Sequence, residues 1–312
     1  MTIARLFGAA FILASAAQSL HGDKSEKQYV RKTENFVVYG WSSGYLMVER
    51  AAVEAEIAYE KLSMQLGLTE HPKRKIPVVI YRSHQDFLKA IGADRRSRIV
   101  GLATYGSEII DIDASDILKP MDEVIPHEVA HIVVGRILKE KASLLPRWMN
   151  EGIAVYFTAK ADSGDAAYIS DAVTNDNLIP LAGLSAAFRK EKTSGLAYAQ
   201  SAAIVEFIET NHGPGAVRGI LSELAETGCF ESAVKKVTGM RIESIYAEWE
   251  KTAYKRFGSW RWARRIPDAV WALMTLAAMA AFYAFTQKKR RTAKKFEEEE
   301  LAQRRWPPFG DI

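Results

Sequence analysis

Two histidines four residues apart, His127 and His131, constrain this chain more than any other feature of its sequence. In a helix this spacing puts both imidazoles on one face, one turn apart, so that both can reach one metal ion at about 2.0–2.1 Å. Glu128 projects to the side of the pair, where its carboxylate can take a proton from a metal-bound water. Such a string arises by chance in roughly one chain in a hundred of this length, so its surroundings matter.

The surroundings of the two histidines favour a metal centre. Residues 126 to 139 form a predicted helix with an apolar stripe, and Pro126 suits its first turn. Glu151 lies 20 residues after His131, where a second helix could return a carboxylate to the metal. Two histidines and a glutamate leave one position open for water, which is typical of catalytic zinc. The alternative is that Glu151 is a solvated acid in a first helical turn.

The rest of the chain predicts an α+β fold. Strands are expected at 36–39 and 76–81, and a hairpin around Gly106 is expected from 99–105 and 108–112. A long helix is expected at 44–66, and Ser83 with Asp86 resembles a capping box that opens a helix through Ile91. Later helices are expected at 196–210, 216–227, 230–237 and 242–257. The Asp, Ser, Gly and Asn residues scattered through 160–192 predict loops and short turns there.

Composition places the chain among globular proteins. Of its 312 residues 48% are hydrophobic and 26% charged, and the net charge of +4 is small, with basic residues crowded near the C-terminus. Nucleic acid is therefore not an expected partner. Cys229 is the only cysteine, which excludes an intramolecular disulfide, and we expect it to be a small buried residue.

The first residues have the layout of a secretory signal. Arg5 precedes an apolar run from Leu6 to Leu13, and Ala14-Ser15-Ala16 provides a cleavage site. We therefore expect a signal peptide at 1–19 and an exported chain; the alternative is an uncleaved anchor or a buried helix.

An apolar run near the C-terminus predicts one membrane span. Residues 269–285 carry no charge, aromatic side chains lie at both ends of the run, and a basic block follows from Lys288 to Arg291. The positive-inside rule then predicts a transmembrane helix at 269–287 and a cytoplasmic tail at 288–312. Arg261, Arg264 and Arg265 on the other flank reduce the charge asymmetry, and the signal peptide favours the same orientation. We expect a single-pass protein of the cell membrane with its body on the exported, periplasmic or extracellular, side.

Several segments together resemble the peptidase MA-like domain of the gluzincin (HExxH...E) zinc metallopeptidases, whose relatives include thermolysin and the membrane aminopeptidases. They are NFVVYG, YEKLSMQLGL, KIPVVIYRSHQDF, IVGLA, HEVAH, LPRWMNEGIAVYF and LAYAQSAAIVEFI, within residues 35–257. The resemblance implies a zincin-like two-lobe metallopeptidase fold, in which a small mixed sheet lobe carries the active-site helix and a helical C-terminal lobe follows, ahead of the transmembrane helix.

The resemblance also implies a site. His127, His131 and Glu151 would hold one Zn²⁺ per chain, and Glu128 would be the catalytic base. Tyr198 is the candidate donor to the oxyanion, and its alternative is an ordinary core tyrosine. The chain departs from thermolysin four positions after the third ligand, where Val155 replaces an acid. Asp122 or Glu123 is then considered as support for the histidines, although each suits a solvated first turn.

The implied activity is hydrolysis of a peptide or protein by a membrane-anchored zinc metallopeptidase. An endopeptidase is favoured, because no segment resembles the N-terminus-binding glycine motif of aminopeptidases. The alternative is an inactive gluzincin-fold protein that acts as a binding module at the membrane surface, although such a module has no need for Glu128. The sequence carries no signal for an oligomeric state.

The strand at 99–105 is the candidate edge for a substrate, because Gly101 leaves room for another backbone. The alternative is that Gly101 marks a β-bulge.

Overall fold

The structure is a computed structural model that describes residues 27–95, 97, 99–104, 106–115, 121–158, 165–258 and 268–305. The chain divides into two compact units, Met1–Phe257 and Gly258–Ile312. The signal peptide expected at 1–19 lies outside the described residues.

The first unit contains a five-stranded mixed sheet in the order β1-β2-β3-β5-β4. Strands β2 (Phe36–Trp41), β3 (Ile76–Tyr81) and β5 (Ile109–Asp113) are parallel to one another, whereas β1 (Gln28–Lys32) and β4 (Gly101–Thr104) pair antiparallel at the two edges. The four predicted strands are confirmed, and β4 and β5 form the predicted hairpin. Strand β1 was not predicted, because its side chains are mostly exposed and lack an apolar alternation.

The two faces of the sheet carry different apolar side chains, as alternation along each strand requires. Val78 and Ile80 belong to the large core shared with the helices, whereas Val79 and Tyr81 form a small second cluster on the other face. Helix α3 (His84–Ile91) supplies Phe87 and Leu88 to that cluster. The side chain of Ser83 accepts from the backbone N–H of Asp86, which confirms the predicted helix start.

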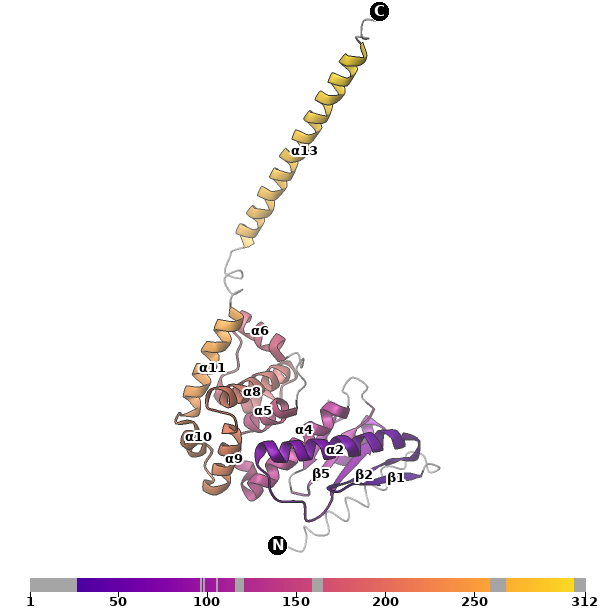
Figure 1. Ribbon diagram of the computed structural model, residues 1–312, viewed down its shortest axis with the longest axis vertical. Coiled ribbons are helices and arrows are strands. Elements are labelled where there is room, and N and C mark those ends of the chain that lie inside the picture. The colour runs from indigo at the N-terminus through magenta and orange to yellow at the C-terminus, as the bar shows by residue number, and fades with distance from the viewer. Residues whose placement is uncertain are drawn as a thin grey trace, which may run out of the picture. The chain divides into compact units, whose positions relative to one another are not determined.

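Helices form the remainder of the first unit (Figure 1). Helices α2 and α4 pack beside the sheet, and α5 to α11 form the helical part that follows. Their bounds are α2 Tyr45–Leu66, α4 Met121–Leu138, α5 Arg147–Thr158, α6 Asp165–Asn175, α7 Leu181–Ala187, α8 Glu191–Asn211, α9 Ala216–Thr227, α10 Phe230–Thr238 and α11 Ile242–Phe257, with short 3-10 helices at Ser42–Gly44 and Lys139–Leu144. The predicted α+β class, with a small mixed sheet, is confirmed.

Three local expectations were wrong. Helix α4 begins at Met121, so Pro126 lies inside it rather than in its first turn; Asp122 and Glu123 suit the positive end of the helix dipole. Helices α6 and α7 occupy much of the segment predicted as loops. Burial of side chains such as Val173 and Leu184 stabilises these helices despite the loop preference of the polar residues around them. Cys229 is exposed, at the N-cap of α10.

The second unit contains one long helix, α13 (Asp268–Arg305). Within the described residues, only its segment from Val270 to Ala302 is long and apolar enough to cross a membrane. Large apolar side chains such as Leu273, Leu276 and Phe282 are exposed along it. The segment includes most of the predicted span at 269–287, and the helix continues without a break through the basic residues that follow.

Candidate metal centre

Helix α4 presents the two histidines from the interior of the first unit. It is apolar on most sides, with Ile125, Val129 and Val133 fully buried, which is typical of a helix covered all round by other elements. His131 is only 8% exposed in this setting. The polar side chains of the motif are therefore held among packed neighbours, which fixes their directions.

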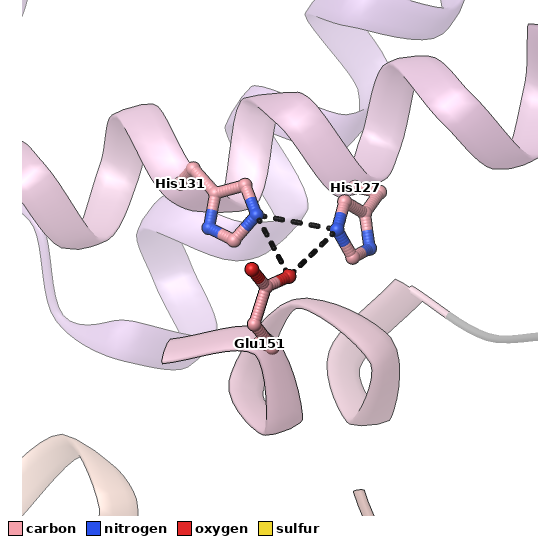
Figure 2. A group of neighbouring side chains, drawn as sticks. All are labelled: His127, His131 and Glu151. Carbon is pink, nitrogen blue, oxygen red and sulfur yellow. Dashed lines mark hydrogen bonds and ion pairs between the residues drawn. The ribbon is translucent and has the colours of Figure 1, made fainter. Parts of the chain in front are cut away.

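Helix α5 brings Glu151 to the histidines. Gly152, the next residue, allows α5 to lie very close to α8, since a Cβ there would be 2.6 Å from the carbonyl oxygen of Ser201. Glu151 is only 9% exposed and its side chain faces His127 and His131 of α4 (Figure 2). Close packing of α5 on α8 thus sets the depth at which the carboxylate meets the two imidazoles.

The three side chains converge on one point (Figure 2). The Nε2 atoms of His127 and His131 are 3.2 Å apart, and Oε2 of Glu151 lies 3.5 Å from the first and 3.6 Å from the second. Ligand atoms 2.0–2.1 Å from a tetrahedral ion are about 3.3–3.4 Å apart. The separations therefore fit a zinc-sized ion held by two nitrogens and one oxygen, and within the described residues this is the one group of three such side chains that could hold a metal.

Electrostatics also favour a cation at this point. Burial raises the pKa of Glu151, but hydrogen bonds from His127 and His131 outweigh it and hold that pKa well below its usual range. Burial lowers the pKa of His131, yet its bond to Glu151 and the charge of Glu128 raise that pKa above its ordinary value. The buried carboxylate is thus an anion that needs positive charge beside it, which a metal ion supplies.

Two neighbours of the cluster were not predicted. Nδ1 of His131 lies 3.2 Å from Oδ1 of Asn150, and this amide oxygen can only accept. With a metal bound, the proton of His131 would therefore sit on Nδ1 and leave the Nε2 lone pair for the metal. Nε of Arg147 donates to Oε1 of Glu151 at 3.2 Å. The i,i+4 spacing of Arg147 and Glu151 was a usable signal in the sequence.

Asp122 was considered as support for the histidines. Its carboxylate instead forms an ion pair with Arg50 at 3.4 Å.

Tyr198, on α8, lies at the edge of the cluster. Its ring centroid is 6.3 Å from that of His127 and 4.8 Å from that of Phe188. Burial and the nearby charge of Glu151 raise the pKa of Tyr198 to about 12, so its hydroxyl keeps its proton at neutral pH. The structure therefore places the ring of Tyr198, with its neutral hydroxyl, beside His127.

Glu128 and the edge strand β4 are in close contact. A Cβ on Gly101 would lie 2.7 Å from both Oε1 of Glu128 and Cγ1 of Val124. The space beside Gly101 is thus filled by α4 rather than reserved for another backbone. Each residue of β4 pairs with one residue of β5 from Gly101 onward, and before Gly101 the N–H of Asp113 donates to the carbonyl of Val100, so the alternative of a β-bulge there is wrong.

The fold and the site define a mixed α+β protein with a helix-borne cluster of two histidines and one glutamate that could hold a metal ion. A family model described as Peptidase MA superfamily matches residues 54–255, well over half of the chain. The chain belongs to the Peptidase MA superfamily, as the sequence resemblance predicted.

Comparison with curated proteins gave no match. Among solved structures, a mutant M1 zinc metallopeptidase from Deinococcus radiodurans is similar at 17% identity and a TM-score of 0.43, covering 72% of this chain and 52% of that one. A two-domain M1 zinc metallopeptidase mutant bound to L-arginine has the same identity and TM-score, covering 72% of this chain and 51% of that one. The chain therefore spans about half the length of these structures.

Replacement of Asn150 should weaken zinc binding without removing a ligand. In Asn150→Ala, His131 loses the contact that fixes its tautomer, and we expect about 10- to 100-fold weaker zinc affinity in a chelator competition assay. Asn211→Ala is the matched control, because Asn211 is exposed at the end of α8 and, among the described residues, its side-chain amide bonds to Phe207 of the same helix. Equal zinc affinity of the two variants would contradict the role of Asn150.

Proposed function

We propose that the chain is a zinc metallopeptidase that hydrolyses internal peptide bonds. Membership of the Peptidase MA superfamily supports a metallopeptidase. The observation that carries the proposal is the convergence of the His127, His131 and Glu151 ligand atoms within 3.2–3.6 Å, with Glu128 adjacent in the same helix. These three residues would hold one Zn²⁺ per chain and leave a fourth position for water.

The protein side chains then have separate tasks. Zinc, when held by His127, His131 and Glu151, would supply a Lewis acid for the scissile carbonyl and would lower the pKa of a bound water. Glu128 accepts the water proton and passes it to the leaving amine, while the neutral hydroxyl of Tyr198 donates to the oxygen that becomes negative. Glu128 is 6% exposed, so it would act in a partly dehydrated site. Asn150 and Arg147 keep the ligands in place through His131 and Glu151.

Two substitutions separate catalysis from metal binding. Glu128→Gln removes only the base, so zinc content should stay at one equivalent while kcat falls by about 10²–10⁴. Glu151→Ala removes a ligand, so both zinc and activity should be lost. Zinc is measured by elemental analysis and cleavage with a peptide library. Wild-type activity in Glu128→Gln would refute the mechanism, and a zinc-loaded wild type that binds but never cleaves peptides would favour the alternative binding module.

We propose that the substrate lies along the outer edge of β4. The backbone N–H of Asp113 donates to the carbonyl of Val100, so these two residues form a hydrogen-bonded pair. Such pairs alternate along an antiparallel ladder, and with Gly101 opposite Ile112 the backbone groups of Gly101 and Ala103 point away from β5. An extended peptide could pair with them beside Glu128, which suits an endopeptidase.

Proline substitutions test this edge. Ala103→Pro removes an outward N–H and should raise KM or abolish turnover while zinc content and the unfolding midpoint stay nearly unchanged. Leu102→Pro is the matched control: it removes an N–H directed at β5 and should lower the unfolding midpoint. An Ala103→Pro variant that unfolds or loses zinc would show that the edge assignment is wrong.

We also propose a single-pass membrane topology. The apolar helix from Val270 to Ala302 supports a span at 269–287. The signal peptide at 1–19 would export the catalytic domain at 35–257, and the basic block after the span would keep the tail at 288–312 in the cytoplasm. The peptidase would then act on the exported side of the cell membrane.

Reporter fusions measure this topology. A reporter after Ile312 should be active in the cytoplasm, and one inserted near residue 163 should be active on the exported side, because the span separates them. Truncation after residue 265 should release a soluble, zinc-binding domain. Reporters that behave alike at both positions would refute the span.

A further inference from the structure

Arg147 places a positive charge beside the metal centre. It is the first residue of α5, and its Nε donates to Oε1 of Glu151, whose other oxygen faces the two histidines. A single carboxylate therefore separates the guanidinium from the point where the three candidate ligand atoms converge. Its side chain is nevertheless 45% exposed, far more than that of Glu151.

Aromatic side chains lie beside this guanidinium. It lies over the ring of Phe188 at 5.1 Å, Phe188 packs edge-on against Tyr198, and Tyr198 packs against His127. The contacts thus form a closed ring that returns to the metal ligands. A guanidinium stacked on an aromatic ring keeps its N–H edge available for hydrogen bonds in the ring plane.

The donors of Arg147 exceed what these contacts use. A guanidinium has five N–H donors. Among the described residues, its side chain donates to Glu151 and lies close enough to Tyr198 to affect the pKa of that hydroxyl. The contact with Glu151 uses the Nε–H, so the N–H donors at the outer end of this half-exposed side chain can reach a ligand.

We propose that Arg147 binds a substrate carboxylate close to the scissile bond and makes the enzyme selective for it. This inference rests on the proposed peptidase function. A carboxylate matches the planar fork of a guanidinium, and a bound cation would take up the charge of Glu151 and leave Arg147 uncompensated. The carboxylate can come from an acidic side chain flanking the cleaved bond or from the C-terminus of a peptide, and the two sources share the same chemistry.

Matched peptides test the proposal. Starting from a library peptide that the zinc-loaded wild type cleaves, Glu and Gln are compared at each position flanking the cleaved bond, and free-acid and amide C-termini are compared at short distances from it. We expect kcat/KM to favour one carboxylate source by about tenfold or more. The position that carries the preference identifies the source, and a wild type with no preference in any pair would overturn the proposal.

Variants assign the preference to Arg147. In Arg147→Gln the carboxylate-to-amide ratio should fall close to one, whereas Arg189→Gln, which removes an exposed cation next to Phe188, should keep the wild-type ratio. A preference that persists in Arg147→Gln would assign it to another residue and overturn the proposal.

A binding measurement separates recognition from chemistry. Calorimetry on the zinc-loaded Glu128→Gln protein should show tighter binding of the carboxylate peptide than of its amide partner, and adding Arg147→Gln should remove the difference. If Arg147→Gln loses zinc, Arg147→Lys replaces it, and a wild-type ratio in Arg147→Lys would reduce Arg147 to support of Glu151 and contradict the proposal. Failure of zinc-loaded wild type to cleave any peptide would instead refute the peptidase function itself.

Discussion

The buried carboxylate of Glu151 is the constraint on which the site depends. An ionised carboxylate that is 9% exposed is costly unless positive or donor groups surround it. His127 and His131 from α4 and Arg147 from its own helix supply those groups. The crossing of α4 and α5 is therefore determined by charge as well as by apolar packing. Loss of the two histidines would leave this buried charge without its main partners.

Helix α4 transmits this constraint to the rest of the first unit. It packs against α2 and β4 on the sheet side and against α5 and α9 on the helical side. One continuous core therefore includes both Val78 of the sheet and Ile204 of α8. The metal centre lies where the two parts share a helix, so a displacement of either part would change the distances between the ligand atoms.

The sequence was informative wherever a local pattern decides the structure. Helices α9 and α11 have the predicted bounds, and Ile76–Tyr81 is the predicted buried strand, because periodicity and capping are local properties. The spacing of His127, His131 and Glu151 also placed them correctly together, since two helices joined by a short connection can close such a group.

Features that depend on packing between distant segments were missed. The amide of Asn150 reaches His131 only because α5 crosses α4 at a particular depth. Helices α6 and α7 form against the core although polar residues lie around them, and β1 is held by pairing with β2 rather than by its own apolar residues. The role of Gly101 was misread for the same reason: its neighbour is a side chain 27 residues further along the chain, which no local pattern specifies.

The contact between Gly101 and Glu128 has an evolutionary consequence. One methyl group at position 101 would occupy the space of the Glu128 carboxylate, although His127, Glu128 and His131 would all be unchanged. If Glu128 is the base, as proposed, a descendant of this chain could lose catalysis and keep its metal through a substitution on a strand that contributes no ligand. Inspection of the motif alone would classify that descendant as active, so the residue at the strand position that corresponds to 101 belongs in any test of whether a relative is still a catalyst.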